Sequence, residues 1–140
     1  LIPVPLHRTR LWMRGYNQAA LLARSISART GMRVMVDGLQ RTRATPKLGG
    51  LGRAQRAKAL RGAIRTKKAR EASIRGRPIV LVDDVLTSGA TSTACVRALL
   101  DAGAKSVRIA CFARVADQST SDFAPPKRET PETAKVPGAA

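Results

Sequence analysis

The sequence contains few of the residues that build metal sites, disulfides or aromatic platforms. Its 140 residues include one histidine, two cysteines and only 3% aromatic residues. Cys95 and Cys111 lie far apart in apolar surroundings, which favours buried, reduced thiols over a disulfide or a metal site. So few aromatic residues also argue against a stacking platform for single-stranded nucleic acid.

Long apolar runs and targeting signals are absent as well. No apolar run approaches the roughly 18 residues of a transmembrane candidate, and no signal-peptide pattern is present. We therefore expect a soluble, cytoplasmic protein without membrane insertion. The first residue is an apolar leucine and not a methionine, so we expect that an N-terminal part of a longer protein precedes it.

Acidic residues are scarce, since 9 of them stand against 26 basic residues, a formal net charge of +17. The segment 41–77 holds thirteen basic residues and a single acidic one, Glu71. This charge fits an anionic partner such as nucleic acid, a polyphosphate metabolite or a membrane surface. A solvated, arginine-rich surface explains it too, so charge alone does not separate a basic enzyme from a nucleic-acid binder.

The apolar pattern predicts one α/β domain over residues 1–115. Strands are expected at 1–4, 33–39, 62–66, 78–82 and 107–113, and helices at 16–30, 53–61 and 91–102. The strand, loop, helix and strand between 78 and 113 form a βαβ unit, which predicts a parallel sheet covered by helices. Three stretches are expected as loops or connections: 5–15, a mobile basic loop around Pro46 and Gly50, and 67–76. Residues 116–140 are rich in Pro, Thr and Ser, which predicts a disordered tail.

Residues 79–91 read IVLVDDVLTSGAT and place two adjacent carboxylates after an apolar strand. Open α/β sheets bind ligands at the carboxyl ends of their parallel strands. Because neighbours on a strand point in different directions, Asp83 and Asp84 are not expected to form a close dyad. Carboxylates at this position suit sugar hydroxyls or Mg²⁺, directly or through water.

The five residues after the apolar pair suit a phosphate. Their small side chains let several backbone N–H groups converge, three of them add hydroxyls, and the following helix points its positive end at the same place. They are Thr87, Ser88, Gly89, Ala90 and Thr91. An ordinary Ser/Thr helix cap is the alternative, but the complete order of strand, acid pair, small loop and helix is more specific. It predicts a site for a ribose 5-phosphate.

At these residues the chain resembles the type I phosphoribosyltransferases, whose signature for 5-phosphoribosyl 1-diphosphate (PRPP) has this form. Two further segments, IPVPLHRTRLWMRGYNQAALLA at 2–23 and LQRTRATPKLGGLGRAQRAKALRGAI at 39–64, resemble the ComF (competence protein F) family. The resemblance covers about residues 2–115. It implies a mostly parallel central sheet flanked by helices, with PRPP and Mg²⁺ bound over the strand ends.

The resemblance also implies roles for individual residues. Asp83 and Asp84 would be the catalytic residues, facing the ribose hydroxyls and metal-bound water, and Thr87–Thr91 would hold the 5′-phosphate. The pyrophosphate side would be formed by Pro5, Leu6, His7, Arg8, Arg53 and Arg56. The family is associated with DNA uptake during natural competence and often carries an N-terminal zinc ribbon.

Three functions fit these observations. The first is a ComF-type protein that transfers or binds the phosphoribosyl group of PRPP, although no general base is compelling, His7 included. The second is a non-catalytic module that binds single-stranded DNA through the basic segment 41–77. The third is a purine-salvage phosphoribosyltransferase, for which no acceptor pocket is apparent. The acceptor and the protein partner, whether a second copy or a component of the competence machinery, stay open.

Overall fold

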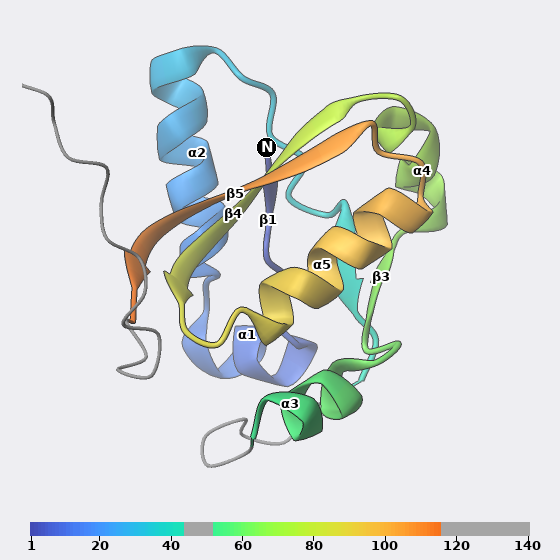
Figure 1. Cartoon of the computed structure of the whole chain (residues 1–140). Coiled ribbons are helices and arrows are strands. Elements are labelled where there is room, and N and C mark those ends of the chain that lie inside the picture. Colours follow the sequence, from blue (N-terminus) through green and yellow to red (C-terminus); the bar gives the residue numbers. More distant parts are fainter. Residues whose placement is uncertain (44–51, 116–140) are drawn as a thin grey trace, which may run out of the picture.

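A parallel sheet of three strands forms the centre of the protein. The computed structural model describes residues 1–43 and 52–115. The strands are β1 (Ile2–Pro3), β4 (Pro78–Leu86) and β5 (Ser106–Arg114), in the order β1-β4-β5 (Figure 1). Both outer strands pair with β4 in parallel, so that Leu81 lies opposite Ile2 on one side and opposite Ile109 on the other. The expected fold class, α/β with a parallel sheet flanked by helices, is confirmed.

Five helices and a small antiparallel sheet surround this centre within the described ranges. The helices are α1 (Arg8–Arg14), α2 (Gln18–Thr30), α3 (Arg53–Leu60), α4 (Lys68–Ile74) and α5 (Ala90–Asp101). The small sheet pairs β2 (Leu39–Arg41) with β3 (Ile64–Thr66). Helix α2 packs against β1 and β4, whereas α5 packs against β4 and β5 and also against β3. Helix α5 therefore joins the parallel sheet to the small sheet.

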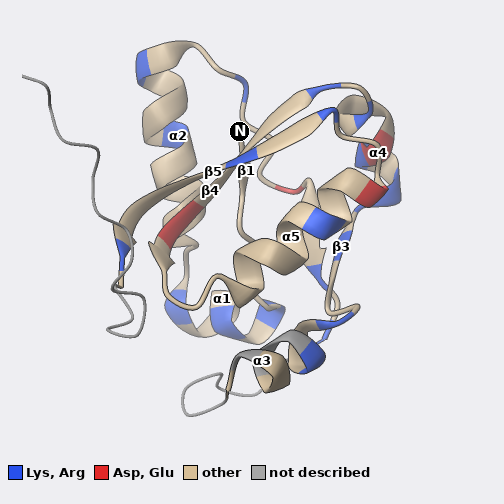
Figure 2. Cartoon of the chain, in the orientation of Figure 1, with Lys and Arg blue, Asp and Glu red and all other residues tan. Residues whose placement is uncertain are grey.

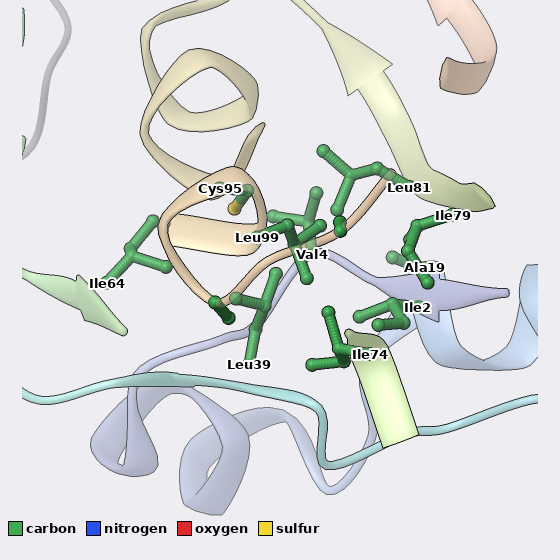
Figure 3. Close-up of a cluster of buried hydrophobic side chains, with 12 residues drawn as sticks. Ile2, Val4, Ala19, Leu39, Ile64, Ile74, Ile79, Leu81, Cys95 and Leu99 are labelled. Carbon is green, nitrogen blue, oxygen red and sulfur yellow. The ribbon is translucent and has the colours of Figure 1, made fainter. Parts of the chain in front are cut away.

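One hydrophobic core fixes these elements relative to each other (Figure 3). Leu81 of β4 and Leu99 of α5 are fully buried, as is Ile74 of α4. Leu39 and Ile64 bring the small sheet into the same cluster. Burying such side chains stabilises the fold by roughly 1.5–3 kcal/mol each, so the position of β2 is set by the core and not by a surface contact.

Several expected elements differ from the structure. The stretch 5–15, expected as a loop, contains α1, and the connection 67–76 contains α4. Helix α1 buries none of its side chains and α4 buries only Ile74, so neither shows the apolar periodicity that predicts a helix. The strand expected at 33–39 is wrong, since β2 begins only at Leu39, and β4 continues to Leu86, beyond the expected end at 82. The basic loop around Pro46 and Gly50 and the tail 116–140 lie outside the described residues.

None of the helices in residues 1–43 and 52–115 is both long enough and apolar enough to cross a bilayer.

The two thiols differ in their surroundings. Cys95 on α5 is fully buried, where loss of hydration, and next the nearby charge of Asp83, raise the pKa of its thiol to about 12. Cys111 on β5 is exposed, so the expectation that both cysteines are buried is wrong for this residue. Both are free thiols, as expected.

We predict that an alkylating reagent modifies one thiol per chain in the native protein and the second only after unfolding, because Cys95 is both inaccessible and protonated. Mass spectrometry of reagent-treated samples, with and without denaturant, measures this. Cys111→Ser should abolish the native-state modification. Two thiols that react equally fast without denaturant would contradict the described packing of α5.

Candidate functional site

The acid pair and the small-residue loop lie at the junction of β4 and α5. Strand β4 runs through Asp83 and Asp84 to Leu86, and α5 starts at Ala90 after the turn 87–89. Gly89 precedes the helix with φ +70°, a left-handed conformation that favours glycine. No side chain among the described residues caps α5. No described side chain therefore competes with an anion for the first N–H groups of this helix, and the phosphate site at residues 87–91 stays a prediction.

Asp83 is a buried link between β4 and α5. It is only 7% exposed, and its Oδ2 accepts a hydrogen bond of 2.8 Å from Ser92 Oγ, in the first turn of α5. Its Oδ1 accepts from the backbone N–H of Asp84 at 3.0 Å. Burial raises the pKa of the Asp83 carboxyl above its usual value, against the Ser92 hydrogen bond, and the Asp84 carboxyl raises it further. Both oxygens of Asp83 are thus engaged within the protein.

Asp84 is more available to a ligand. It is half-buried, and its Oδ1 accepts from the Val85 N–H at 2.9 Å, while no hydrogen bond from a described residue reaches its Oδ2. Both acids line the same pocket, and the Asp84 carboxyl lies close enough to raise the pKa of Asp83, but their internal hydrogen bonds differ.

The carboxylates at this junction fit the coordination needs of a Mg²⁺ ion that arrives with a phosphorylated ligand. Within residues 1–43 and 52–115 no group of three or more His, Cys, Asp or Glu side chains converges as a metal cage. Mg²⁺ commonly needs only one or two carboxylates, with its other positions filled by water and by phosphate oxygens of the substrate. Asp84, with Asp83 behind it, can supply that carboxylate contact.

A pocket of about 190 Å³ connects the acid pair with the turn after β1, with α1, with the start of α2, with β2 and with α5. Its lining residues are Val4, Pro5, Leu6, Arg10, Arg14, Asn17, Gln18, Ala19, Arg41, Asp83, Asp84 and Thr91. Figure 2 shows the acidic segment of β4 and the basic segments of α1, which line this pocket together with β2. The lining of the pocket thus contains two acidic residues and three arginines.

Those three arginines are site residues that the sequence did not single out. Arg10 and Arg14 stand four residues apart on α1, a spacing that places them on one face of a helix, but the helix itself was not expected. Arg41 lies two residues after Leu39 on β2 and shares its face, but a three-residue strand is too short for this pattern to be read from the sequence.

The residues expected on the pyrophosphate side are only partly in this pocket. Pro5 and Leu6 line it, whereas His7 and Arg8 do not. His7 is the N-cap of α1, with its Nδ1 2.8 Å from Thr9 Oγ1. Arg8 is the exposed first residue of α1. Arg53 and Arg56 belong to α3, and their side chains lie outside the described part of the protein.

Asn17 holds the turn after β1 against α2. Its Oδ1 accepts from the Ala19 N–H at 3.1 Å as the cap of α2, and its Nδ2 donates to the Val4 carbonyl at 3.0 Å. One side chain therefore fixes both the start of a helix and the wall of the pocket.

A larger hollow of about 560 Å³ runs along the other side of α5, between this helix and β3 with α4. Ser88 and Ala90 line it, whereas Thr91 lines the smaller pocket. The small-residue loop thus separates two hollows. Because Asp83 and Asp84 line only the smaller one, that pocket is the candidate site.

Comparison with known families identifies the family of the chain. The phosphoribosyl transferase domain family matches residues 14–134, which include the acid pair, the loop and α5. The chain belongs to the phosphoribosyl transferase domain family. The resemblance read from the acid pair and the small-residue loop is confirmed.

Relatives of this phosphoribosyl transferase domain include proteins named for DNA handling. The chain is 37% identical over 114 residues to a protein from Escherichia coli named DNA utilization protein YhgH, and 33% identical to a protein of the same name from Salmonella typhi. It is 32% identical to competence protein F of Haemophilus influenzae. Each match covers 81% of this chain, and the chain spans about half the length of these relatives, 48–49%. They bear out the expected ComF-type resemblance.

We predict that Ser92→Ala lowers the free energy of unfolding of the domain by about 1–3 kcal/mol, because it leaves Oδ2 of the buried Asp83 without a donor. Thr93→Ala is the matched control, since it removes an exposed hydroxyl from the next position of α5 and should change stability by less than about 0.5 kcal/mol. Urea unfolding followed by circular dichroism measures both. Equal effects of the two substitutions would show that the Ser92–Asp83 bond does not hold the junction.

Proposed function

We propose that this domain binds PRPP with Mg²⁺ in the pocket of about 190 Å³ and transfers its phosphoribosyl group to an acceptor. One observation carries the proposal: Thr91 of the small-residue loop, the acid pair, and three arginines from the two elements α1 and β2 line one pocket at the carboxyl end of β4. A ligand with a phosphate at one end, a diol in the middle and a diphosphate at the other end matches these groups in that order.

Each part of the pocket has a task toward this ligand. The turn 87–89 and the first N–H groups of α5 donate to the 5′-phosphate, with help from the Thr91 hydroxyl. Asp84 accepts hydrogen bonds from the ribose hydroxyls, while Asp83, fixed by Ser92, keeps Asp84 in place. The guanidinium groups of Arg10, Arg14 and Arg41 neutralise the negative charge that grows on the leaving diphosphate.

Transfer requires a nucleophile that attacks the anomeric carbon as the bond to the diphosphate breaks and its electron pair leaves with the diphosphate. The transition state resembles an oxocarbenium ion, so positioning and neutralisation of the leaving group supply most of the rate enhancement. Bound Mg²⁺ adds positive charge at the diphosphate. The described residues offer no obvious general base, since His7 is engaged with Thr9, and the acceptor's own basicity therefore governs its reactivity.

We predict that Asp84→Asn weakens PRPP binding at least tenfold, because hydrogen bonds to a charged acceptor are worth about 1.5–3 kcal/mol. The substitution keeps the acceptor for the Val85 N–H, so the local backbone is retained. Isothermal titration calorimetry with PRPP and Mg²⁺ measures the affinity. The control is Asp101→Asn, which removes an exposed carboxylate at the far end of α5 and should leave binding unchanged.

Unaltered PRPP binding in both Asp84→Asn and the double variant Asp83→Asn/Asp84→Asn would contradict the assignment of the acid pair to the PRPP site. Diphosphate release with a panel of purine bases, pyrimidine bases and amines then separates transfer from binding. A domain that binds PRPP but releases no diphosphate with any acceptor is a binding module and not a transferase.

A second function, binding of single-stranded DNA, is supported by the outward surface of α1. We define this α1 surface as Arg8, Leu11, Trp12, Met13 and Tyr16. Trp12 is 90% exposed and Met13 84%, and α1 contains no acidic residue. Aromatic residues are scarce in the chain, but its single tryptophan and single tyrosine both lie on this surface. An exposed aromatic ring beside arginine offers base stacking and phosphate contact together.

Several basic residues of the segment 41–77 make contacts within the protein. We therefore propose α1, and not this segment, as the DNA-binding surface. Arg43 donates to the carbonyls of Ala59 and Arg61, and Lys67 and Arg70 bond to Asp37. The names of the relatives, DNA utilization protein and competence protein F, agree with a role near DNA.

We predict that an unlabelled single-stranded oligonucleotide quenches the fluorescence of Trp12, the only tryptophan, and that Trp12→Leu weakens binding about five- to a hundredfold. Phe112→Leu is the control, because it removes another aromatic ring, 82% exposed, from strand β5. Fluorescence anisotropy of a labelled oligonucleotide over a salt series measures the affinity, with a log–log slope of about −0.7 per phosphate contact. Unchanged fluorescence together with unchanged affinity of Trp12→Leu would exclude α1 as the DNA surface.

A further inference from the structure

Strand β5 forms an open edge of the central sheet. It runs over nine residues, Ser106–Arg114, and among the described strands it pairs with β4 alone. The opposite end of the sheet is covered, because the Leu1 backbone exchanges hydrogen bonds with Arg33 and Met35. An open edge presents a row of backbone N–H and C=O groups without a partner strand. Of the two ends of this sheet, β5 is therefore the one at which a further strand can add.

The side chains of β5 do not protect this edge. Proteins commonly keep an open edge short, place charges on it or interrupt it with proline, whereas β5 is long, contains no proline and carries only two charges, Arg108 and Arg114. Ile109 and Phe112 are exposed on it, and Val115 is exposed directly after it. These apolar residues belong neither to the candidate pocket nor to the α1 surface. An exposed apolar edge of this length indicates a surface that another polypeptide strand covers.

The two faces of β5 carry different side chains. Residues that stand opposite each other in a sheet point to the same face, and Cys111 stands opposite Asp83, whose carboxyl is bonded to α5. Cys111 and Ile109 therefore lie on the α5 face of the sheet, because residues two apart share a face. Arg108 and Phe112 lie on the other face, where α2 packs against β1 and β4. Along β5 an arginine and an exposed aromatic ring are thus aligned on one face.

A second copy of β5, running antiparallel, fits this edge in one register. Ala110 is the midpoint of the strand, so a twofold axis at Ala110 pairs all nine residues. Arg108 then stands opposite Phe112 of the second copy, and Ser106 stands opposite its Arg114. A guanidinium over an aromatic ring is a favourable contact, and this register places no like charges opposite each other. The edge is therefore complementary to itself.

Charge disfavours the adjacent register and does not prevent association. A twofold axis at Cys111 shortens the overlap and places Arg108 opposite Arg114, and like charges directly opposite are destabilising. The net charge of +17 on each chain also opposes association. Screening, however, limits repulsion between exposed charges to about 8 Å at physiological salt, so the contacts along the edge decide.

We propose that β5 pairs with β5 of a second copy of this chain around a twofold axis at Ala110, which joins the two parallel sheets into one continuous sheet. Closed twofold symmetry is the commonest arrangement among homo-oligomers. The proposal does not depend on the proposed binding of PRPP or DNA. Because the two copies of β5 run in opposite directions, the two candidate pockets lie at opposite ends of the shared sheet.

Disulfide cross-linking tests the register. Residues directly opposite in an antiparallel pair have Cα atoms about 4.5–5.5 Å apart, a separation that a disulfide spans. Ile109→Cys places a thiol opposite Cys111 of the second copy. We expect oxidation with copper–phenanthroline in air to convert most of this variant into a disulfide-linked dimer on a non-reducing gel.

Wild-type protein and Ala113→Cys are the matched controls. Ala113→Cys carries its added thiol on the same face, two positions to the other side of Cys111, but there it stands opposite Val107 of the second copy. Both controls should stay single chains, because Cys111 of each copy stands opposite Ile109 and Cys95 is buried. Cross-linking of either control as strong as that of Ile109→Cys would overturn the proposed register, and an Ile109→Cys variant that does not cross-link would overturn the pairing.

Sedimentation equilibrium supplies a second readout that leaves the thiols unchanged. We expect the wild-type protein to form a dimer that Phe112→Arg weakens about tenfold, because the substitution sets two like charges opposite each other at two symmetric places. The further change Arg108→Glu should restore the dimer by pairing opposite charges. Circular dichroism checks that both variants are folded. A wild-type monomer, or a dimer that Phe112→Arg does not weaken, would overturn the proposal.

Discussion

The buried hydrogen bond from Ser92 Oγ to Asp83 is the contact on which the candidate site depends. It joins the end of the central strand to the first turn of α5 at 2.8 Å, and so it sets the shape of the turn between them. Helix α5 in turn carries Cys95 and Leu99 into the core and packs against β3. The position of the small-residue loop and the position of the small sheet therefore follow from the same helix.

The burial of Asp83 explains why the two acids make different contacts. Burial raises the pKa of Asp83, which means that its charge is poorly solvated. The protein offsets this with the Ser92 hydroxyl and the Asp84 N–H, and these contacts use both oxygens. Asp83 makes the internal contacts, whereas Asp84 lines the pocket and no described residue donates a hydrogen bond to its Oδ2. Of these two aspartates, Asp83 thus fixes the local backbone, and Asp84 can contact a ligand.

The sequence predicts the parts of the fold that have a strong local pattern. The run IVLV, the acid pair and the small residues before an apolar helix predict the β4–α5–β5 unit and the loop, because each of these has its own periodicity or turn chemistry. It does not predict α1, whose polar and apolar residues all lie on the surface, or α4, which buries only Ile74. Arg41 was not predictable for a different reason. Its role depends on the pairing of β2 with β3 and on the shared core, which are long-range contacts without a local sequence signal.

Helix α1 links the two proposed functions, because under these proposals its opposite faces would serve different ligands. Arg10 and Arg14 face the pocket, while Arg8 and Trp12, also four residues apart, belong to the outward surface. Helix α1 buries none of its side chains, so the core holds it only weakly, and the ends of α1 are set by His7 and Gly15. A ligand that orders Arg10 and Arg14 would therefore also order the outward surface. By thermodynamic linkage the effect is reciprocal: if a diphosphate in the pocket strengthens binding of a DNA strand to α1, that strand strengthens binding of the diphosphate by the same factor. If both proposed sites bind their ligands, the arrangement of α1 thus favours coupling of diphosphate binding to DNA binding over two independent sites.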